Sequence, residues 1–272
     1  MLSAVAFYAL IIPVSAFAWT RILSDLDERW SLWQLSCIMG STQLAKYVPG
    51  NIAQHIARVS LALKQGMKTG AFTTSVAVET ALAILACLVV ASTLAIANPM
   101  IWSVIAPHLS PSDIQPILLA LILIVDMAFL VMLSPLKDSV ITYSRRGLSA
   151  VLMIRPLTLL LTITAYACNY LLIGAGLFLL AQSMGVANIL NYSILTAAFA
   201  WAWIVGFLAP GAPAGLGVRE GILALIFNQF ADEATVLTLV IVLRLVTLMG
   251  DCVWFIISSI GLTINSHRQS NA

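Results

Sequence analysis

The sequence predicts an all-α polytopic membrane protein with about five full spans and two broken, re-entrant helical hairpins in an inverted-topology repeat. Hydrophobic residues make up 61% of its 272 positions and charged residues only 9%, and the mean hydropathy is +1.02. Soluble folds need more polar surface than this composition supplies. Long apolar runs recur along the chain, and Pro and Gly interrupt two of them. The whole chain, 1–272, is therefore predicted to be one integral membrane domain.

Five uninterrupted apolar runs are long enough to cross a hydrocarbon core roughly 30 Å thick. The predicted spans lie at 1–19, 71–97, 117–135, 156–182 and 235–262. The first lacks the basic segment and the small-residue cleavage pattern of a signal peptide, so we expect a retained helix. No other stretch is long and polar enough to form a separate soluble domain. The four cysteines show no metal-ligand spacing, and neither a metal, a cofactor nor a nucleic-acid partner is predicted.

Two further apolar regions, 34–66 and 189–230, are broken in the middle by proline and glycine. Proline lacks a backbone N–H, and glycine accepts backbone angles that end a helix. Backbone groups freed in this way cannot face lipid, so the breaks must lie inside protein or line a wet cavity. A helix that begins beyond a break presents free N–H groups that favour an anion. The residues predicted to form the helix breaks are Pro49, Gly50, Pro210, Gly211, Gly215 and Gly217.

Positive charge in the short loops predicts the orientation of the chain, because Lys and Arg are retained on the cytoplasmic side. The loop 136–155 carries four such residues, whereas the loops 98–116 and 183–188 carry none. Lys64 and Lys68 then fall on the same side as the first of these loops. The sequence therefore predicts a multi-pass protein of the cytoplasmic membrane, with 136–155 inside.

With this orientation the two broken regions enter the membrane from opposite sides. Each follows one span and precedes another, which predicts a first repeat at about 1–97 and a second at about 156–262. The span 117–135 joins them. Arg58 and Arg219 each lie nine residues after the proline of a break. An inverted repeat of this kind places a transport site near the midplane, between discontinuous helices.

The arm after the first break is predicted to be an amphipathic helix, because polar and apolar residues alternate with helical spacing. The apolar residues fall on the face opposite the polar ones, so the polar face suits a water-filled groove. An interfacial helix lying flat on the membrane is the alternative. The polar face carries Asn51, Gln54, His55 and Arg58.

Two charged residues lie deep within predicted spans. Glu79 is about eight residues into its span and Arg244 about nine, which places each roughly 12 Å from the nearer membrane surface. Ionisable residues at such depth are costly and normally face a cavity or a partner. We expect Glu79 to pair with a cationic centre that contains Arg58, Arg219 or Arg244, and Asp251 to be a candidate partner of Arg244. A purely structural ion pair is the alternative to a role in binding or gating.

Three features carry a resemblance to a known family: KYVPGNIAQHIAR at 46–58, Glu79 in the following span, and PGAPAGLGVREG at 210–221. Together they resemble the lysylphosphatidylglycerol synthase transmembrane-region family, also described as flippase-like. The resemblance implies translocation of a polar phospholipid or a lipid-linked sugar phosphate across the cytoplasmic membrane. It also implies that Arg58 and Arg219 engage the phosphate. The chain lacks the soluble aminoacyl-transferase domain of bifunctional members, so synthase activity is not implied.

The expected function is therefore a flippase rather than an enzyme, with no catalytic residues. Its expected partners are an anionic or zwitterionic membrane lipid, or a lipid-linked saccharide, together with envelope-biosynthesis enzymes. Two alternatives stay open: a polyprenyl-phosphate-dependent glycosyltransferase using the acidic cluster at 25–28, and a non-catalytic scaffold of an envelope-biosynthesis complex. The predicted substrate-binding residues are Arg58, Arg219, Glu79, Arg244, Asn51, Gln54, His55 and Glu220.

Overall fold

The computed structural model describes residues 1–48, 53–96, 98, 154–209 and 212–270, and all elements in that part of the chain are helical. Four of its helical segments are long and apolar enough to cross a membrane, namely Leu2–Asp25, Thr69–Ala95, Pro156–Ser183 and Glu233–Thr263. The predicted all-α polytopic membrane fold is therefore confirmed. The fifth predicted span, 117–135, lies outside the described residues.

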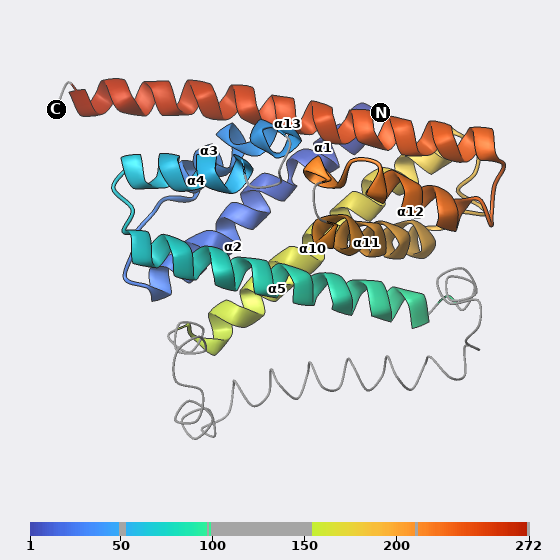
Figure 1. Cartoon of the computed structure of the whole chain (residues 1–272), viewed down its shortest axis with the longest axis horizontal. Helices are drawn as coiled ribbons and strands as arrows, with labels where there is room; N and C mark the ends of the chain where they lie inside the picture. The colour runs from blue at the N-terminus through green and yellow to red at the C-terminus, as the bar shows by residue number, and fades with distance from the viewer. Residues whose placement is uncertain (49–52, 97, 99–153, 210–211, 271–272) are drawn as a thin grey trace, which may run out of the picture.

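Long helices and shorter ones both occur, as the interrupted hydropathy pattern predicts. The long helices α5 and α13 lie on opposite sides of the molecule, and α10 crosses obliquely between them (Figure 1). The elements in chain order are α1 (Leu2–Ala9), α2 (Ile11–Asp25), α3 (Leu32–Ser41), η1 (Gln43–Tyr47), α4 (Ala53–Lys64), α5 (Thr69–Ile96), α10 (Pro156–Ser183), α11 (Tyr192–Leu208), η2 (Pro213–Gly215), α12 (Val218–Phe227) and α13 (Glu233–Ser270).

The first span is longer than predicted, because α2 continues to Asp25 instead of ending near residue 19. Ile22 and Leu23 are fully buried. The guanidinium of Arg21 lies over the ring of Phe17, 5.1 Å from its centroid. An arginine whose stem runs along apolar surface does not end a membrane helix, so the positive charge at 21 was a poor boundary signal.

Pro13 interrupts the backbone hydrogen bonding between α1 and α2. A helical residue at this position would donate to the carbonyl of Ala9, and proline has no N–H to donate. The indole Nε1 of Trp254, on α13, donates to that carbonyl instead, at 2.6 Å. The break between α1 and α2 is therefore hydrogen-bonded to α13, and this bond fixes the end of α1 that carries Tyr8.

Replacing Trp254 with Phe should lower the free energy of unfolding by about 1–3 kcal/mol, because the Ala9 carbonyl loses its donor in apolar surroundings. The substitution Pro13→Ala restores a backbone donor, so it should recover much of that loss in the double variant. Thermal unfolding in detergent measures both effects. If Trp254→Phe lowered the free energy of unfolding equally in the protein with Pro13 and in the Pro13→Ala variant, the indole hydrogen bond would add nothing to stability.

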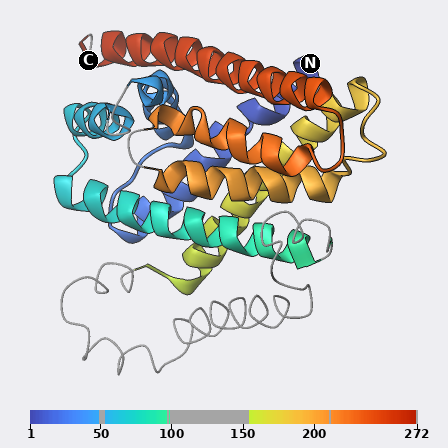
Figure 2. The same ribbon diagram turned by 45° about the vertical axis from the view of Figure 1, so that its right-hand side comes forward.

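The helices of the two predicted halves run in opposite directions. In Figure 1, α5 runs from left to right and α13 from right to left, and Figure 2 shows the same sense. The packing follows the same exchange: α3 packs against α13, and its counterpart α11 packs against α5. The counterparts α2 and α10 pack against each other at the centre. This exchange of contacts agrees with the predicted inverted-topology repeat.

Both broken regions are built from short helices. α3 and α4 have 10 and 12 residues, and α12 has 10. At 1.5 Å per residue these helices are about 15–18 Å long, roughly half of a hydrocarbon core. α11 reaches further with 17 residues. Arms of this length agree with hairpins that turn back inside the membrane.

α4 turns its charged side inward and its apolar side outward. Arg58 is only 8% exposed, whereas Ile56 on the opposite side is 61% exposed. An interfacial helix lying flat on a membrane has the reverse orientation, with its charges in water. The packing of α4 therefore favours the inner arm of a hairpin over an interfacial helix.

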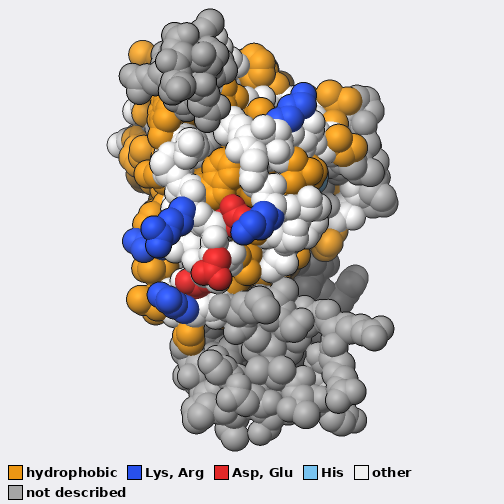
Figure 3. Space-filling model, turned by 90° about the vertical axis from the view of Figure 1, so that its left-hand side faces the viewer, with side chains coloured by type: hydrophobic (Ala, Val, Ile, Leu, Met, Phe, Trp, Pro, Cys, Tyr) orange, Lys and Arg blue, Asp and Glu red, His pale blue; other side chains and the backbone are white. Residues whose placement is uncertain are grey.

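Charged side chains gather at the end of the molecule where α2 ends and where α5 and α10 begin (Figure 3). Two ion pairs lie there, Lys68–Glu28 at 3.4 Å and Arg155–Asp25 at 3.7 Å. The turn between α10 and α11, which carries Asn188, lies at the opposite end (Figure 1). The charged end is the one that the loop charges predict to be cytoplasmic.

Single cysteines at Gln65 and Asn188, each in a cysteine-free background, should react with a membrane-impermeant maleimide from opposite sides. In intact cells we expect labelling at 188, and labelling at 65 only after permeabilisation, because the two turns lie at opposite ends of the spans. Gel-shift of the labelled protein measures the reaction. Labelling of both cysteines in intact cells would contradict the inverted arrangement.

Candidate functional site

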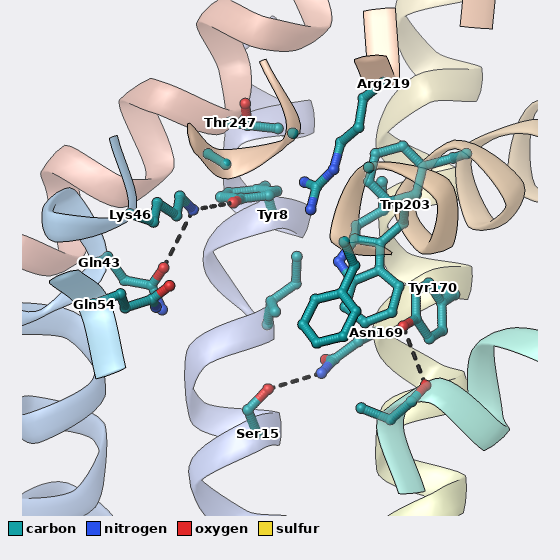
Figure 4. Close-up of a pocket in the computed structure, with 18 of the residues that line it drawn as sticks. Tyr8, Ser15, Gln43, Lys46, Gln54, Asn169, Tyr170, Trp203, Arg219 and Thr247 are labelled. Atoms are coloured by element: carbon teal, nitrogen blue, oxygen red, sulfur yellow. Dashed lines mark hydrogen bonds between the residues drawn. The ribbon is translucent and has the colours of Figure 1, made fainter. Parts of the chain in front are cut away.

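A cavity of about 500 Å³ is lined by elements of both predicted halves. The first half supplies α1, α2, η1, α4 and α5, the second supplies α10, α11, η2, α12 and α13, and Figure 4 shows that elements of the two halves are intermixed around the cavity. Where α2 crosses α10, Asn169 Nδ2 donates to Ser15 Oγ at 2.9 Å. The cavity thus lies among the short helices of both broken regions.

Arg58 and Glu79 form a buried, bidentate ion pair on one wall of the cavity. Nη1 of Arg58 donates to Oε1 at 3.2 Å and Nη2 to Oε2 at 2.6 Å, and both residues are 8% exposed. The guanidinium lies 3.8 Å from the centroid of a ring of Trp19, whose Nε1 donates to Ser75 Oγ at 2.9 Å. The pair fixes α4 against α5, and Arg58 is the arginine that contacts Glu79.

The counterpart helices α12 and α13 carry an ion pair with the signs exchanged. Here the acid, Glu220, lies on the short helix and the base, Arg244, on the long one, with 3.3 Å between Nε and Oε1. The other oxygen of Glu220 accepts the backbone N–H of Gly217 at 2.7 Å and so caps α12. The start of α12, where free N–H groups were expected to favour an anion, therefore already holds a carboxylate.

A third charged cluster joins η1, α1 and α13 around Asp251, which is 2% exposed. Lys46 Nζ lies 2.7 Å from Oδ2. The hydroxyls of Tyr47 and Tyr8 donate to Oδ2 and Oδ1 at 2.7 and 3.2 Å. Asp251 thus pairs with Lys46 and not with Arg244, its expected partner, because Arg244 turns to α12 instead.

Arg219 is the one cation of the cavity wall that forms no ion pair with the described residues. Its Nε is buried, and no described residue hydrogen-bonds to it. Two glycines make room for its stem: a Cβ on Gly206 would lie 2.6 Å from Arg219 Cγ, and one on Gly215 would lie 2.7 Å from Nε. Figure 4 shows the guanidinium reaching between Tyr8 and Trp203.

Positive charge exceeds negative charge around the cavity in the described part of the chain. Three of the four basic side chains form ion pairs with acidic side chains. The charge of Arg219 is left uncompensated among the described residues. Arg219 is partly buried, and an uncompensated charge that is partly withdrawn from water is costly, so the site suits an anion. The basic side chains are Lys46, Arg58, Arg219 and Arg244, and the acidic ones are Glu79, Glu220 and Asp251.

The structure brings most of the predicted binding residues together. Those that line the cavity are Arg58, Arg219, Glu79, Arg244, Gln54, His55 and Glu220. Among the predicted helix breaks, Gly215 lines the cavity and Gly217 is the exposed N-cap of α12. The predicted residues outside the described part are Asn51, Pro49, Gly50, Pro210 and Gly211.

Sequence reasoning missed several residues of the cavity wall. Lys46 lies in the broken apolar region, and the rule that singled out Glu79, an ionisable residue inside the membrane, would have found it. Tyr8, Tyr170 and Trp203 also line the cavity. Aromatic residues are common on membrane helices, so their spacing alone carried no signal.

The acidic cluster at 25–28 is used to tie loops together. Oδ2 of Asp25 accepts the backbone N–H of Arg155 at 2.8 Å. Glu28 accepts from Trp30 Nε1 at 3.1 Å and pairs with Lys68 at 3.4 Å. Within the described residues no group of three potential metal ligands occurs. The cluster therefore has a structural use that needs no metal.

No family model matches the chain, and no curated protein matches it.

Proposed function

We propose that the protein translocates a polar lipid with an anionic headgroup, either a phospholipid or a lipid-linked sugar phosphate, across the cytoplasmic membrane. The observation that carries the proposal is Arg219, whose guanidinium has no carboxylate partner among the described residues and reaches into a cavity between two oppositely oriented halves. A guanidinium binds two phosphate oxygens at once. A phosphate headgroup would supply the negative charge that the described wall lacks.

The architecture supports movement of the lipid rather than simple storage. Cavities between inverted repeats become accessible from alternate sides when one half moves against the other. Gln54 and His55 add polar side chains to the wall near Arg58, and Glu79 lies where a positive part of a zwitterionic headgroup would pass. The resemblance to the flippase-like family points to the same class of substrate. Envelope-biosynthesis enzymes would then be partners that consume the lipid.

The alternative functions gain no specific support. A membrane-embedded glycosyltransferase would use the acidic cluster at 25–28, but ion pairs engage both Asp25 and Glu28. A scaffold would have no need of a cavity with an uncompensated arginine. Translocation therefore remains the function that the site supports best.

Leaflet exchange in proteoliposomes tests the proposal. Vesicles of phosphatidylethanolamine and phosphatidylglycerol would carry traces of fluorescent phosphatidylglycerol, phosphatidylethanolamine or undecaprenyl phosphate. We expect an impermeant quencher to reach the inner-leaflet pool of at least one probe when the protein is present, and of none in protein-free vesicles. Equal protection of all three probes in both kinds of vesicle would overturn the proposal.

Replacing Gly206 with Ala should slow translocation while changing the free energy of unfolding by no more than about 1 kcal/mol. The added Cβ would meet Arg219 and push its guanidinium aside, but Ala also favours the helical conformation of α11 by up to about 1 kcal/mol. Gly221→Ala is the matched control, because a Cβ there meets open space. Leaflet exchange and thermal unfolding are measured for both. Equal rates for the two variants would show that the position of Arg219 does not matter.

A further inference from the structure

An apolar groove of about 560 Å³ runs between α4 and α5 on the outer side of the molecule. α4 supplies Val59, and α5 supplies Phe72, Ala77, Ala81 and Ile84 along the length of the groove. Ala77 and Ala81 are exposed. α4 and the first turns of α5 lie at the same end of the molecule (Figure 1).

The groove and the polar cavity meet. His55, Val76 and Thr80 line both of them. The Arg58–Glu79 pair lies beside this junction and is part of the cavity wall. A molecule that crossed the junction would therefore pass from charged and polar side chains to mostly apolar ones within one turn of α5.

Small side chains of α5 line the groove in the described part of the chain. α5 presents Thr73, Ala77 and Ala81 at successive turns of the helix. α13, its counterpart, presents the larger exposed side chains of Leu237, Ile241 and Leu245. Among the described residues, α5 therefore offers more room at its exposed face than α13 does.

We propose that this groove holds the hydrocarbon tail of a lipid whose anionic headgroup occupies the cavity. The inference rests on the proposed function and deepens it, because it assigns the substrate to membrane lipids rather than to free anions. A tail drawn into the polar cavity would lose its apolar surroundings at every methylene group. The groove lets the headgroup reach Arg219 while the tail stays against apolar side chains.

Photo-crosslinking in proteoliposomes tests the groove. Vesicles of phosphatidylethanolamine and phosphatidylglycerol would contain a trace of phosphatidylglycerol with a diazirine in its acyl chain, and the labelled peptides would be identified by mass spectrometry. We expect adducts on residues 73–84 that are lost in Ala77→Trp, which fills the groove. Thr238→Trp, a substitution at an exposed site on α13, should leave them unchanged.

A second blocker covers the case in which Ala77→Trp fails to fold. Ala77→Cys in a cysteine-free background would be alkylated after reconstitution with N-dodecylmaleimide, and the adducts should again be lost. Adducts that persist in both blocked proteins, or that are absent from 73–84 in the parent protein, would overturn the inference.

The outcomes separate this inference from the proposed function. Groove adducts without leaflet exchange would support the tail site and overturn translocation. Leaflet exchange with no groove adducts would support translocation and overturn the tail site. Binding of water-soluble glycerol phosphate as tightly as the lipid, with no groove adducts, would assign the cavity to free anions and overturn the tail site.

Discussion

Replacing Arg219 with Gln should slow leaflet exchange of an anionic lipid by about 10- to 100-fold, because a hydrogen bond to a charged group contributes roughly 1.5–3 kcal/mol. The same change should not destabilise the protein. Arg219 makes no ion pair with the described residues, so its removal relieves an uncompensated charge and should raise the free energy of unfolding. Lost transport with gained stability distinguishes a binding residue from a structural one.

Two further variants define the role of Arg219. Arg219→Lys keeps the charge but loses the planar fork that binds two oxygens, so it should restore only part of the transport. Arg21→Gln removes an exposed arginine from the surface of α2 and should leave exchange unchanged. Exchange rates are measured with the headgroup-quenching assay, and stability by thermal unfolding. Wild-type exchange by Arg219→Gln would remove the basis of the proposed function.

Replacing Glu79 with Gln should cost about 3–5 kcal/mol in the free energy of unfolding, because it leaves the charge of Arg58 buried without its partner. The bidentate contact and the 8% exposure of both side chains place this pair among the buried ones. Denaturant titration in detergent measures the loss. We expect it to be among the largest effects of any single polar substitution in the protein.

A double-mutant cycle tests whether the loss comes from the pair. Arg58→Gln combined with Glu79→Gln should cost less than the sum of the two single changes, because no charge is then left unpaired. Glu220→Gln is the control at the counterpart pair. Its side chains are 22% and 27% exposed, so water screens the remaining charge and the cost should be smaller. Strict additivity at 58 and 79 would show that the two residues do not act as a pair.

The sequence was sufficient to predict the membrane class, four of the spans and the shortness of the interrupted helices. These features depend on local signals, namely apolar runs and Pro-Gly breaks, which act within about twenty residues. The predicted end of the first span was wrong, because Arg21 lies within α2 and its side chain runs along apolar surface. Glu79 was identifiable for a similar local reason, as an acid inside a long apolar run.

The choice of partners could not be predicted, because it depends on contacts between segments far apart in the chain. Nothing near Asp251 in the sequence indicates that Lys46 and two tyrosines would surround it. Arg244 was a plausible partner by helical spacing, but α12 brings Glu220 to it. The same long-range packing decides which arginine is left without a carboxylate, so Arg219 could be singled out only from the structure.

The exchanged signs of the two ion pairs have a consequence for the response to voltage. A two-fold axis in the plane of a membrane inverts the component of any dipole along the membrane normal, so identical pairs in the two halves would cancel. In this protein the base is on the short helix in Arg58–Glu79 and on the long helix in Glu220–Arg244. The exchange turns one dipole back relative to that cancellation. In an inverted arrangement, any components of the two dipoles along the membrane normal would then add, and a membrane potential would act on both pairs in the same direction.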